Sequence, residues 1–311
     1  TVGYPLGPEK ATTYAIPAGD LDGDGDLDVV VGNDQAENWV YINDGKGGFE
    51  RAWSVGPEIE PTRSASLYDL DGDGSLDLLV TNRGAPNGFY LNDGSGRFGP
   101  KRLFGDPQGS TIAVAVGDID ADGDPDLVVV GEWMRVSLFR NDGETFTDIT
   151  EQAGLDTTSG WWNCIKVSDL DGDGDMDLAA GNYGLNSILK ASAAEPVEMY
   201  VNDFDGNGRP EAIICSYIKG QSYPLASLDE LVTQLPSLKE QYPSYSGFGG
   251  KSITDIFGKD LVETSMKKSV VLFESCLFIK RGAGSFDKVR LPRQAPVSYT
   301  HLKLPTTIPS C

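Results

Sequence analysis

Asp20-Leu-Asp-Gly-Asp-Gly-Asp-Leu-Asp28 places five carboxylates at alternate positions in nine residues, with glycine at its fourth and sixth positions. Two carboxylates about 4 Å apart repel by roughly 1 kcal/mol in water, and by about 4 kcal/mol at an effective dielectric constant of about 20. A loop that gathers several of them is therefore strained unless a cation neutralises them. Because the side chains offer only oxygen ligands, this spacing favours calcium.

The nine-residue pattern recurs along the chain. Its five copies begin at Asp20, Asp69, Asp118, Asp169 and Asp203. Short apolar runs, often β-branched, flank each of the four full loops; the third loop, for example, lies between Ile112–Val116 and Leu127–Val130. Such flanks predict that each loop is the turn of a β-hairpin.

A second turn follows the loop at a fixed distance. Asn-Asp-Gly begins at Asn43, Asn92 and Asn141, in each case 23 residues after the first Asp of the loop. Asn and Asp before Gly supply the positive φ angles that tight hairpins need. One unit of about 49 residues is therefore a four-stranded antiparallel sheet, which is the size of a β-propeller blade. Because one such sheet cannot bury both faces, we expect the blades to stack around a centre.

The fourth and fifth units depart from this pattern. The fourth has no Asn-Asp-Gly turn and reaches the next loop after 34 residues, so we expect its outer edge to be abbreviated. In the fifth, a helical insertion is predicted over about 227–268, because Ser227 and Glu230 form a capping-box pattern and Pro236 suits the first position of a second helix. We expect the outer strands of the fifth unit at 270–273 and 276–279.

The sequence thus predicts an all-β fold: a β-propeller of four-stranded antiparallel blades, with about five blades visible and a small helical insertion in the fifth. A fragment of a seven-bladed ring is an alternative that the pattern leaves open. We expect the propeller to span 1–296. Residues 297–311 are predicted to be a non-native tail, because 297–305 resembles a peptide translated from sequencing-adapter DNA. That tail holds His301, the chain's single histidine, and Cys311.

The formal net charge of −22 originates in the five loops, which hold 22 of the 47 acidic residues and leave the rest matched by 25 Lys and Arg. This charge argues against nucleic acid or an anionic membrane as a partner. No apolar run approaches the 18 or so residues of a membrane span. Cys164, Cys215 and Cys276 are widely spaced, so we expect buried thiols, although a disulfide pair remains an alternative.

Comparison of the five loops separates predicted metal ligands from spacers. Positions 1, 3, 5 and 9 carry oxygen-bearing side chains in every loop: Asp20, Asp22, Asp24 and Asp28; Asp69, Asp71, Asp73 and Asp77; Asp118, Asp120, Asp122 and Asp126; Asp169, Asp171, Asp173 and Asp177; Asp203, Asp205, Asn207 and Glu211. Position 7 varies, so its backbone carbonyl is the predicted ligand at Asp26, Ser75, Asp124, Asp175 and Arg209. We predict four structural calcium sites and leave the fifth open, because its loop departs from the pattern. The alternatives are solvated acidic turns, or a metal that is catalytic or bridges directly to a ligand.

An EF-hand is the rival calcium motif, and it does not fit. Its bidentate Glu at position 12 is replaced here by Val, Ala or Ile, and the flanking segments are predicted strands. The hairpin loop, the Asn-Asp-Gly turn and the nearby Gly84-Ala-Pro instead resemble the FG-GAP/VCBS repeat of integrin α-subunit headpieces and many bacterial surface proteins, over about 10–290. Gly131-Glu-Trp-Met and 158–163 further resemble Bacteroidetes outer-surface proteins related to cartilage acidic protein, often associated with an ASPIC/UnbV module.

This resemblance implies a calcium-binding β-propeller outside the cytoplasm, at the surface or in the periplasm of a bacterium. Extracellular calcium modules bind at about 10⁻⁴ to 10⁻³ M, a concentration that the cytosol does not supply. The leading hypothesis is a non-enzymatic binding or adhesion module for a carbohydrate or protein partner. The predicted ligand-binding residues, on the face opposite the acidic loops, are Arg83, Trp133, Trp161, Trp162 and Tyr183. Packing of the tryptophans between blades is the alternative.

A second hypothesis is a polysaccharide lyase or hydrolase that uses carboxylates near the propeller axis. The sequence assigns no catalytic residues to it. Ser-His-Asp, Cys-His and His-rich zinc arrangements need histidines that this chain does not offer outside its predicted tail. Phosphate-binding glycine motifs do not occur, and the loop glycines lie between aspartates that would repel phosphate.

Overall fold

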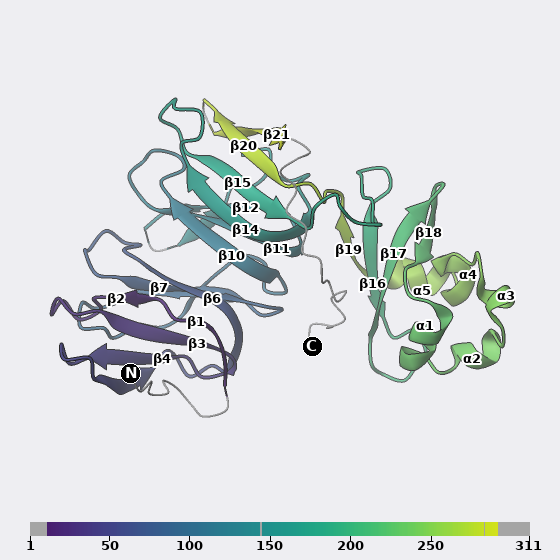
Figure 1. Ribbon diagram of the computed structural model, residues 1–311, viewed down its shortest axis with the longest axis horizontal. Helices are drawn as coiled ribbons and strands as arrows, with labels where there is room; N and C mark the ends of the chain where they lie inside the picture. Colours follow the sequence, from purple (N-terminus) through teal and green to yellow (C-terminus); the bar gives the residue numbers. More distant parts are fainter. Residues whose placement is uncertain (1–10, 144, 283, 292–311) are drawn as a thin grey trace.

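Antiparallel β-sheets dominate the computed structural model, which describes residues 11–143, 145–282 and 284–291 (Figure 1). The first three blades follow the predicted strand order. They consist of β1 (Thr12–Ala15), β2 (Ala18–Gly19), β3 (Asp28–Ala36), β4 (Trp39–Asn43) and β5 (Phe49–Ser54); β6 (Glu60–Tyr68), β7 (Asp77–Asn82), β8 (Asn87–Tyr90) and β9 (Arg102–Phe104); and β10 (Ser110–Gly117), β11 (Asp126–Met134), β12 (Ser137–Asn141) and β13 (Phe146–Asp148). In blade 1, β1 and β2 together take the place of the first strand, because both pair with β3.

Blade 4 draws its outer strands from much later in the chain. It begins with β14 (Gly160–Ser168) and β15 (Asp177–Asn182) and continues with β20 (Cys276–Arg281) and β21 (Ser285–Arg290). β20 pairs with β15, placing Phe278 opposite Leu178, and β21 pairs with β20. The outer edge of this blade is therefore complete, and the prediction of an abbreviated fourth unit is wrong. The strand expected at 276–279 belongs to blade 4 rather than to the fifth unit.

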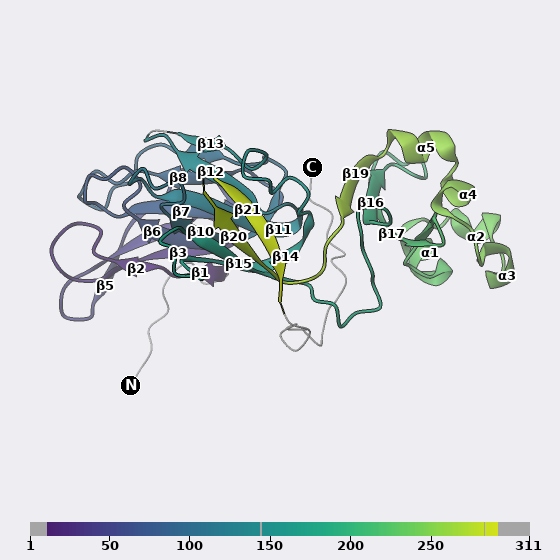
Figure 2. The ribbon, with the colours of Figure 1, turned by 90° about the horizontal axis from the view of Figure 1, so that it is seen from above.

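The fifth unit is inserted between β15 and β20. Its sheet contains β16 (Val197–Asn202), β17 (Glu211–Ile218), β18 (Gln221–Pro224) and β19 (Met266–Val270), in the order β18-β17-β16-β19. The order differs from that of the other blades, because β19 pairs with the first strand of the unit rather than with the third. In Figures 1 and 2 this sheet and its helices stand to one side of blades 1–4.

The helical insertion predicted for the fifth unit is confirmed. It consists of α1 (Leu228–Gln234), α2 (Leu238–Gln241), α3 (Tyr245–Phe248), α4 (Ile253–Phe257) and α5 (Lys259–Thr264). Ser227 and Glu230 form the expected capping box at the start of α1. The expectation for Pro236 is wrong, because α2 begins at Leu238 with Ser237 as its N-cap residue. The helices bury Leu228, Leu231 and Ile253 with Ile213 and Cys215 of β17, so they cover one face of the sheet.

Successive residues of each central strand face the neighbouring blades on its two sides, so the hydrophobic cores lie between blades. Leu78 of β7 packs toward blade 1, whereas Leu79 packs toward blade 3 with Leu127. Val128 of β11 in turn faces blade 4, where Leu178 and Phe278 complete the cluster. Blades with two apolar faces must stack, which is why the chain forms a β-propeller, as predicted.

The three cysteines in the described part of the chain are free thiols, and their burial is only partly as predicted. Cys215 and Cys276 are buried, and burial raises the pKa of Cys215 to about 12 and that of Cys276 to about 11. Cys164 is exposed, contrary to the prediction, because it faces away from the core on β14 while its neighbour Ile165 faces inward. The predicted tail 297–311, with His301 and Cys311, lies outside the described residues.

Within the described ranges, none of the helices is long and apolar enough to cross a membrane.

Candidate calcium loops and a pocket between blades

The carboxylates of each acidic loop converge as the sequence predicts, although not all four predicted side chains take part. In the first loop the carboxylates at positions 1, 3 and 9 bring oxygens within 4.8 Å of one another. The converging groups are Asp20, Asp22 and Asp28; Asp69, Asp71 and Asp77; Asp118, Asp120 and Asp122; Asp169, Asp171 and Asp177; and Asp203, Asp205 and Glu211. Only the third group includes position 5 and omits position 9.

Position 5 has a separate structural role in all five loops. The Oδ1 atom of Asp24 accepts the backbone N–H of Asp26 at 2.9 Å, which closes a turn around the side chain. Asp73, Asp122, Asp173 and Asn207 accept the equivalent bond. Asn207 can replace Asp here because its carbonyl oxygen is the same kind of acceptor.

Position 1 organises the backbone of the loop. Asp20 accepts the N–H of Gly23 at 2.8 Å with one oxygen and that of Gly25 at 3.0 Å with the other, and both glycines have positive φ. The third loop carries Ala121 at position 4 instead of glycine, also at positive φ. Its Asp118 Oδ1 is buried and has no hydrogen-bond partner within the described ranges. An orphaned carboxylate oxygen in an all-oxygen donor set fits a calcium ion.

Position 9 joins the loop to the rest of its blade. Asp28 is buried and accepts the N–H of Leu21 at 2.9 Å and that of Asn43, in the third strand, at 2.8 Å. Asp77, Asp126 and Asp177 make the same pair of bonds. In blade 4 the third-strand donor is Lys280, which independently places β20 as the third strand of that blade.

Burial disfavours the charged form of these carboxylates. It raises the pKa of Asp77 to about 6; repulsion from Asp71 and Asp73 adds to this effect, whereas the two backbone N–H bonds oppose it. Burial likewise raises the pKa of Asp126 and of Glu211. A bound cation would favour the charged forms.

The Asn-Asp-Gly turns of blades 2 and 3 link each of these blades to the loop of the blade before it, a role that the sequence pattern alone did not predict. The Nδ2 of Asn92 donates to the Leu21 carbonyl of the first loop at 2.9 Å, and that of Asn141 donates to the Leu70 carbonyl of the second at 2.8 Å. The position-2 side chains Leu21 and Leu70 are buried at these junctions, whereas Leu170, at the same position in the fourth loop, is 44% exposed.

The predicted ligand-binding residues lie on the side of the blades away from the acidic loops, but most are inside the protein. Trp133, Trp161 and Tyr183 form one aromatic cluster, with ring centroids 5.0–5.1 Å from that of Trp161. Trp133 is 9% exposed and Trp161 is 3% exposed. Trp162 lies in the core between blades 3 and 4, and Arg83 pairs with Glu132 across blades 2 and 3 at 3.4 Å. This placement favours the packing alternative for the tryptophans.

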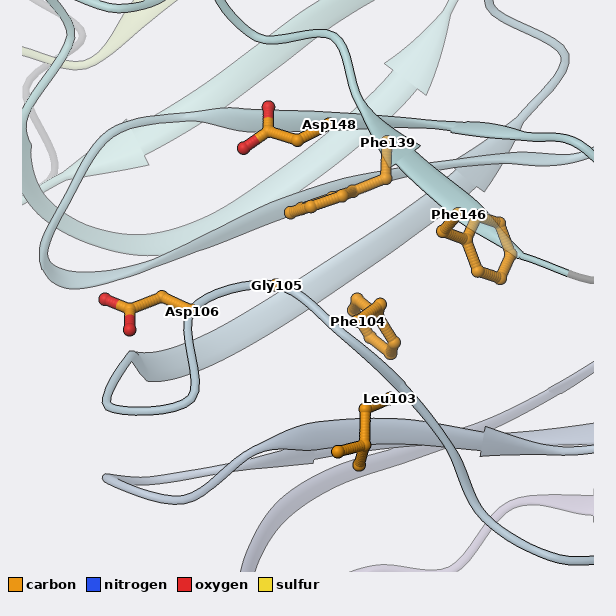
Figure 3. Close-up of a pocket in the computed structure, with 7 residues that line it drawn as sticks. All are labelled: Leu103, Phe104, Gly105, Asp106, Phe139, Phe146 and Asp148. Carbon is orange, nitrogen blue, oxygen red and sulfur yellow. The ribbon is translucent and has the colours of Figure 1, made fainter.

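A pocket of about 430 Å³, which sequence reasoning missed, opens between the outer strands of blades 2 and 3 (Figure 3). Its lining consists of Leu103, Phe104, Gly105, Asp106, Phe139, Phe146 and Asp148. In Figure 3 the two carboxylates lie at one end and the phenyl rings at the other. Asp148 also pairs with Arg135 at 2.9 Å. A phenylalanine follows each Asn-Asp-Gly turn (Phe49, Phe98 and Phe146), and this was the one sequence signal that pointed to a lining residue.

Several solved structures resemble this chain at low identity. The V. cholerae biofilm matrix protein Bap1 is 18% identical with a TM-score of 0.37, and the match covers 66% of this chain and 35% of that protein. An Agrocybe aegerita lectin described as recognising non-reducing terminal N-acetylglucosamine is 20% identical with a TM-score of 0.38, covering 89% of this chain and 79% of the lectin. BBS1N, solved in complex with ARL6DN, is 15% identical with a TM-score of 0.38, covering 70% and 68%.

No curated protein matches the sequence. The model of the FG-GAP-like repeat, however, matches three overlapping segments, 20–80, 69–129 and 118–180. Each segment runs from one acidic loop to the strand that follows the next loop, so it spans the junction between two blades. Together the segments cover more than half of the chain without a gap, and the protein therefore belongs to the FG-GAP-like repeat family.

Proposed function

We propose that this protein is a non-enzymatic, calcium-stabilised binding module that acts outside the cytoplasm and recognises a carbohydrate. The convergence of three acidic side chains in each of five loops carries the calcium part of the proposal. The aromatic and acidic pocket between blades 2 and 3 carries the recognition part.

Calcium would be held by the side chains at positions 1, 3 and 9, or at positions 1, 3 and 5 in the third loop, with the position-7 carbonyl as a further predicted ligand. The ion would supply the positive charge that the loop lacks and relieve the repulsion among its carboxylates. Because position 9 also accepts an N–H from the third strand, as Asp28 does from Asn43, a neutralised loop favours the folded blade. The fifth loop has Glu211 at position 9, and its group also converges.

The pocket suits a sugar ring by its chemistry and size. Its volume of about 430 Å³ lies within the range of roughly 300–1,000 Å³ that is usual for small-ligand sites. The exposed side chain of Leu103 and the partly exposed phenyl ring of Phe146 offer apolar surface to the C–H groups of a sugar. Asp106 and Asp148 can accept hydrogen bonds from its hydroxyl groups. Arg135 offsets part of the acidic charge, which favours a neutral polyhydroxylated ligand over a strongly cationic one.

A glycan-binding experiment tests this proposal. The protein in calcium-containing buffer is screened against a glycan array, and a bound glycan is then titrated into Phe146→Ala and into the control Phe49→Ala. Phe49 follows the equivalent turn in blade 1, outside the pocket, so only Phe146→Ala is expected to weaken binding, by about tenfold or more. Equal affinities for the two variants would contradict the pocket assignment.

The same screen separates the proposal from its alternatives. Release of shortened oligosaccharide from a bound polysaccharide would contradict a non-enzymatic function and favour the lyase or hydrolase hypothesis. An absence of glycan binding, together with binding to a purified protein that Phe146→Ala abolishes, would make the partner a protein.

A further inference from the structure

The fourth acidic loop differs from the first three in the residues that approach it from the third strand. Lys280 donates its backbone N–H to Asp177 at 2.8 Å, as Asn43 does to Asp28 in blade 1. Lys280 and Arg281 therefore occupy the positions that hold Asn and Asp in the Asn-Asp-Gly turns of blades 1–3. Blade 4 thus has two cationic side chains at positions where blades 1–3 have a neutral and an acidic one.

Both cations reach into the fourth loop. The Nζ of Lys280 lies 3.3 Å from Asp175 Oδ1, and the side chain of Lys280 is only 5% exposed. Arg281 Nη1 lies 3.1 Å from Asp171 Oδ2. Asp171 is one of the three converging carboxylates of this loop, so a guanidinium already contacts an oxygen that a calcium ion would need.

These contacts change how the loop can interact with calcium. An incoming ion must compete with Arg281 for Asp171, and it is repelled by an ammonium that lies on the neighbouring Asp175. The buried Lys280 cannot easily leave, because its charge would lose its carboxylate partner away from water. Arg281 is about half exposed and also approaches Asp287 at 3.5 Å, so it can turn from the loop to that carboxylate.

We infer that Lys280 and Arg281 are resident counter-ions of the fourth loop, which weaken its calcium binding relative to the loops of blades 1–3 and hold its shape when calcium is scarce. This inference rests on the proposed calcium binding. It adds a difference between the blades: the loops of blades 1–3 bind calcium, whereas in blade 4 Lys280 and Arg281 of β20 supply positive charge to the loop.

The test installs the blade 1–3 residues at these two positions, as Lys280→Asn combined with Arg281→Asp. Bound calcium is measured by equilibrium dialysis over a range of free calcium concentrations, with the folded state checked by circular dichroism. The variant is expected to bind calcium at the fourth loop roughly tenfold more tightly than the wild type, because neither cation then competes with calcium for the carboxylates of the loop. The gain should vanish when Asp169 and Asp171 are also replaced by Asn.

A control and a milder variant make the result decisive. Lys239→Asp with Lys259→Asn alters the net charge equally at two exposed helical positions and should leave calcium binding unchanged. Arg281→Gln alone removes only the contact with Asp171 at an exposed side chain and should still tighten binding by about threefold. Unchanged affinity in Arg281→Gln would overturn the inference, as would a gain no larger than that of the helical control. Wild-type protein that binds no calcium at all would instead refute the proposed function.

Discussion

Individual carboxylates in one loop have different roles despite their equal spacing. Asp28 is buried and accepts two backbone N–H groups from different strands, whereas Asp24 is exposed and accepts one N–H within its own turn. Asparagine can perform the second role, since Asn207 does so in the fifth loop, but it would place an NH₂ group against an N–H donor in the first.

We therefore predict different stabilities for Asp28→Asn and Asp24→Asn, which make the same change in charge within the same loop. Urea unfolding in calcium-free buffer should show Asp28→Asn destabilised by about 1–3 kcal/mol, because a buried donor loses its acceptor. Asp24→Asn should stay within about 0.5 kcal/mol of the wild type, as exposed substitutions usually do. Equal losses in the two variants would contradict this assignment.

Much of the residue-scale chemistry could be predicted from the repeats. Alignment of the five loops identified positions 1, 3, 5 and 9, where every loop has an oxygen-bearing side chain, and positions 1, 3 and 9 converge in four of the five loops. It could not separate position 5 from the others, since an Asp that closes a turn and an Asp that faces an ion look alike in sequence. The pocket residues Phe104 and Asp106 carried no signal, because they come together only when two blades stack.

At the scale of elements, the Asn-Asp-Gly turn connects blades as well as closing a hairpin. Asn92 is buried and donates to the Leu21 carbonyl in the loop of the preceding blade and to the Leu76 carbonyl in its own blade. Asn43, at the same place in blade 1, donates to the Leu27 carbonyl of its own blade. The two asparagines thus differ by a bond that crosses between blades.

This difference predicts that Asn92→Ala is more destabilising than Asn43→Ala. We expect the first variant to lose about 1–2 kcal/mol more than the second, since it leaves the buried Leu21 carbonyl without that donor. Chemical unfolding of both variants under identical calcium-free conditions measures the comparison. If Asn43→Ala lost as much as Asn92→Ala, the bond between blades would contribute nothing.

The order of elements shows why part of the topology could not be predicted. Units 1–3 are continuous in sequence, so their strands and turns follow from local patterns. Blade 4 is interrupted by residues 183–275, and no local signal says that β20 pairs with β15 across this gap. The deciding contacts are tertiary: Phe278 and Phe286 join Trp162 and Leu178 in one buried cluster.

At the scale of the whole molecule, the acidic loops of blades 1–3 lie where neighbouring blades meet, so their charge affects the stability of the entire arc. The first four loops are each bonded to the third strand of their own blade through position 9. The first two loops are also bonded to the following blade through Asn92 and Asn141. Neutralising a loop therefore stabilises contacts between blades as well as the hairpin that contains it. The predicted β-propeller agrees with the structure at this scale, except that the fifth unit is a separate sheet inserted in blade 4 rather than a further blade. The proposed partner depends on the pocket.

The most direct test of this account is the thermal unfolding of the wild-type protein with calcium and with a chelator, using magnesium at the same concentration as the control. An ion that binds only the folded state stabilises it by about 2.7 kcal/mol per site at 100 times its Kd. With several loops occupied, the account predicts that calcium raises the midpoint by roughly 10 °C or more over the chelated protein, and magnesium far less. An unchanged midpoint would contradict structural calcium in these loops.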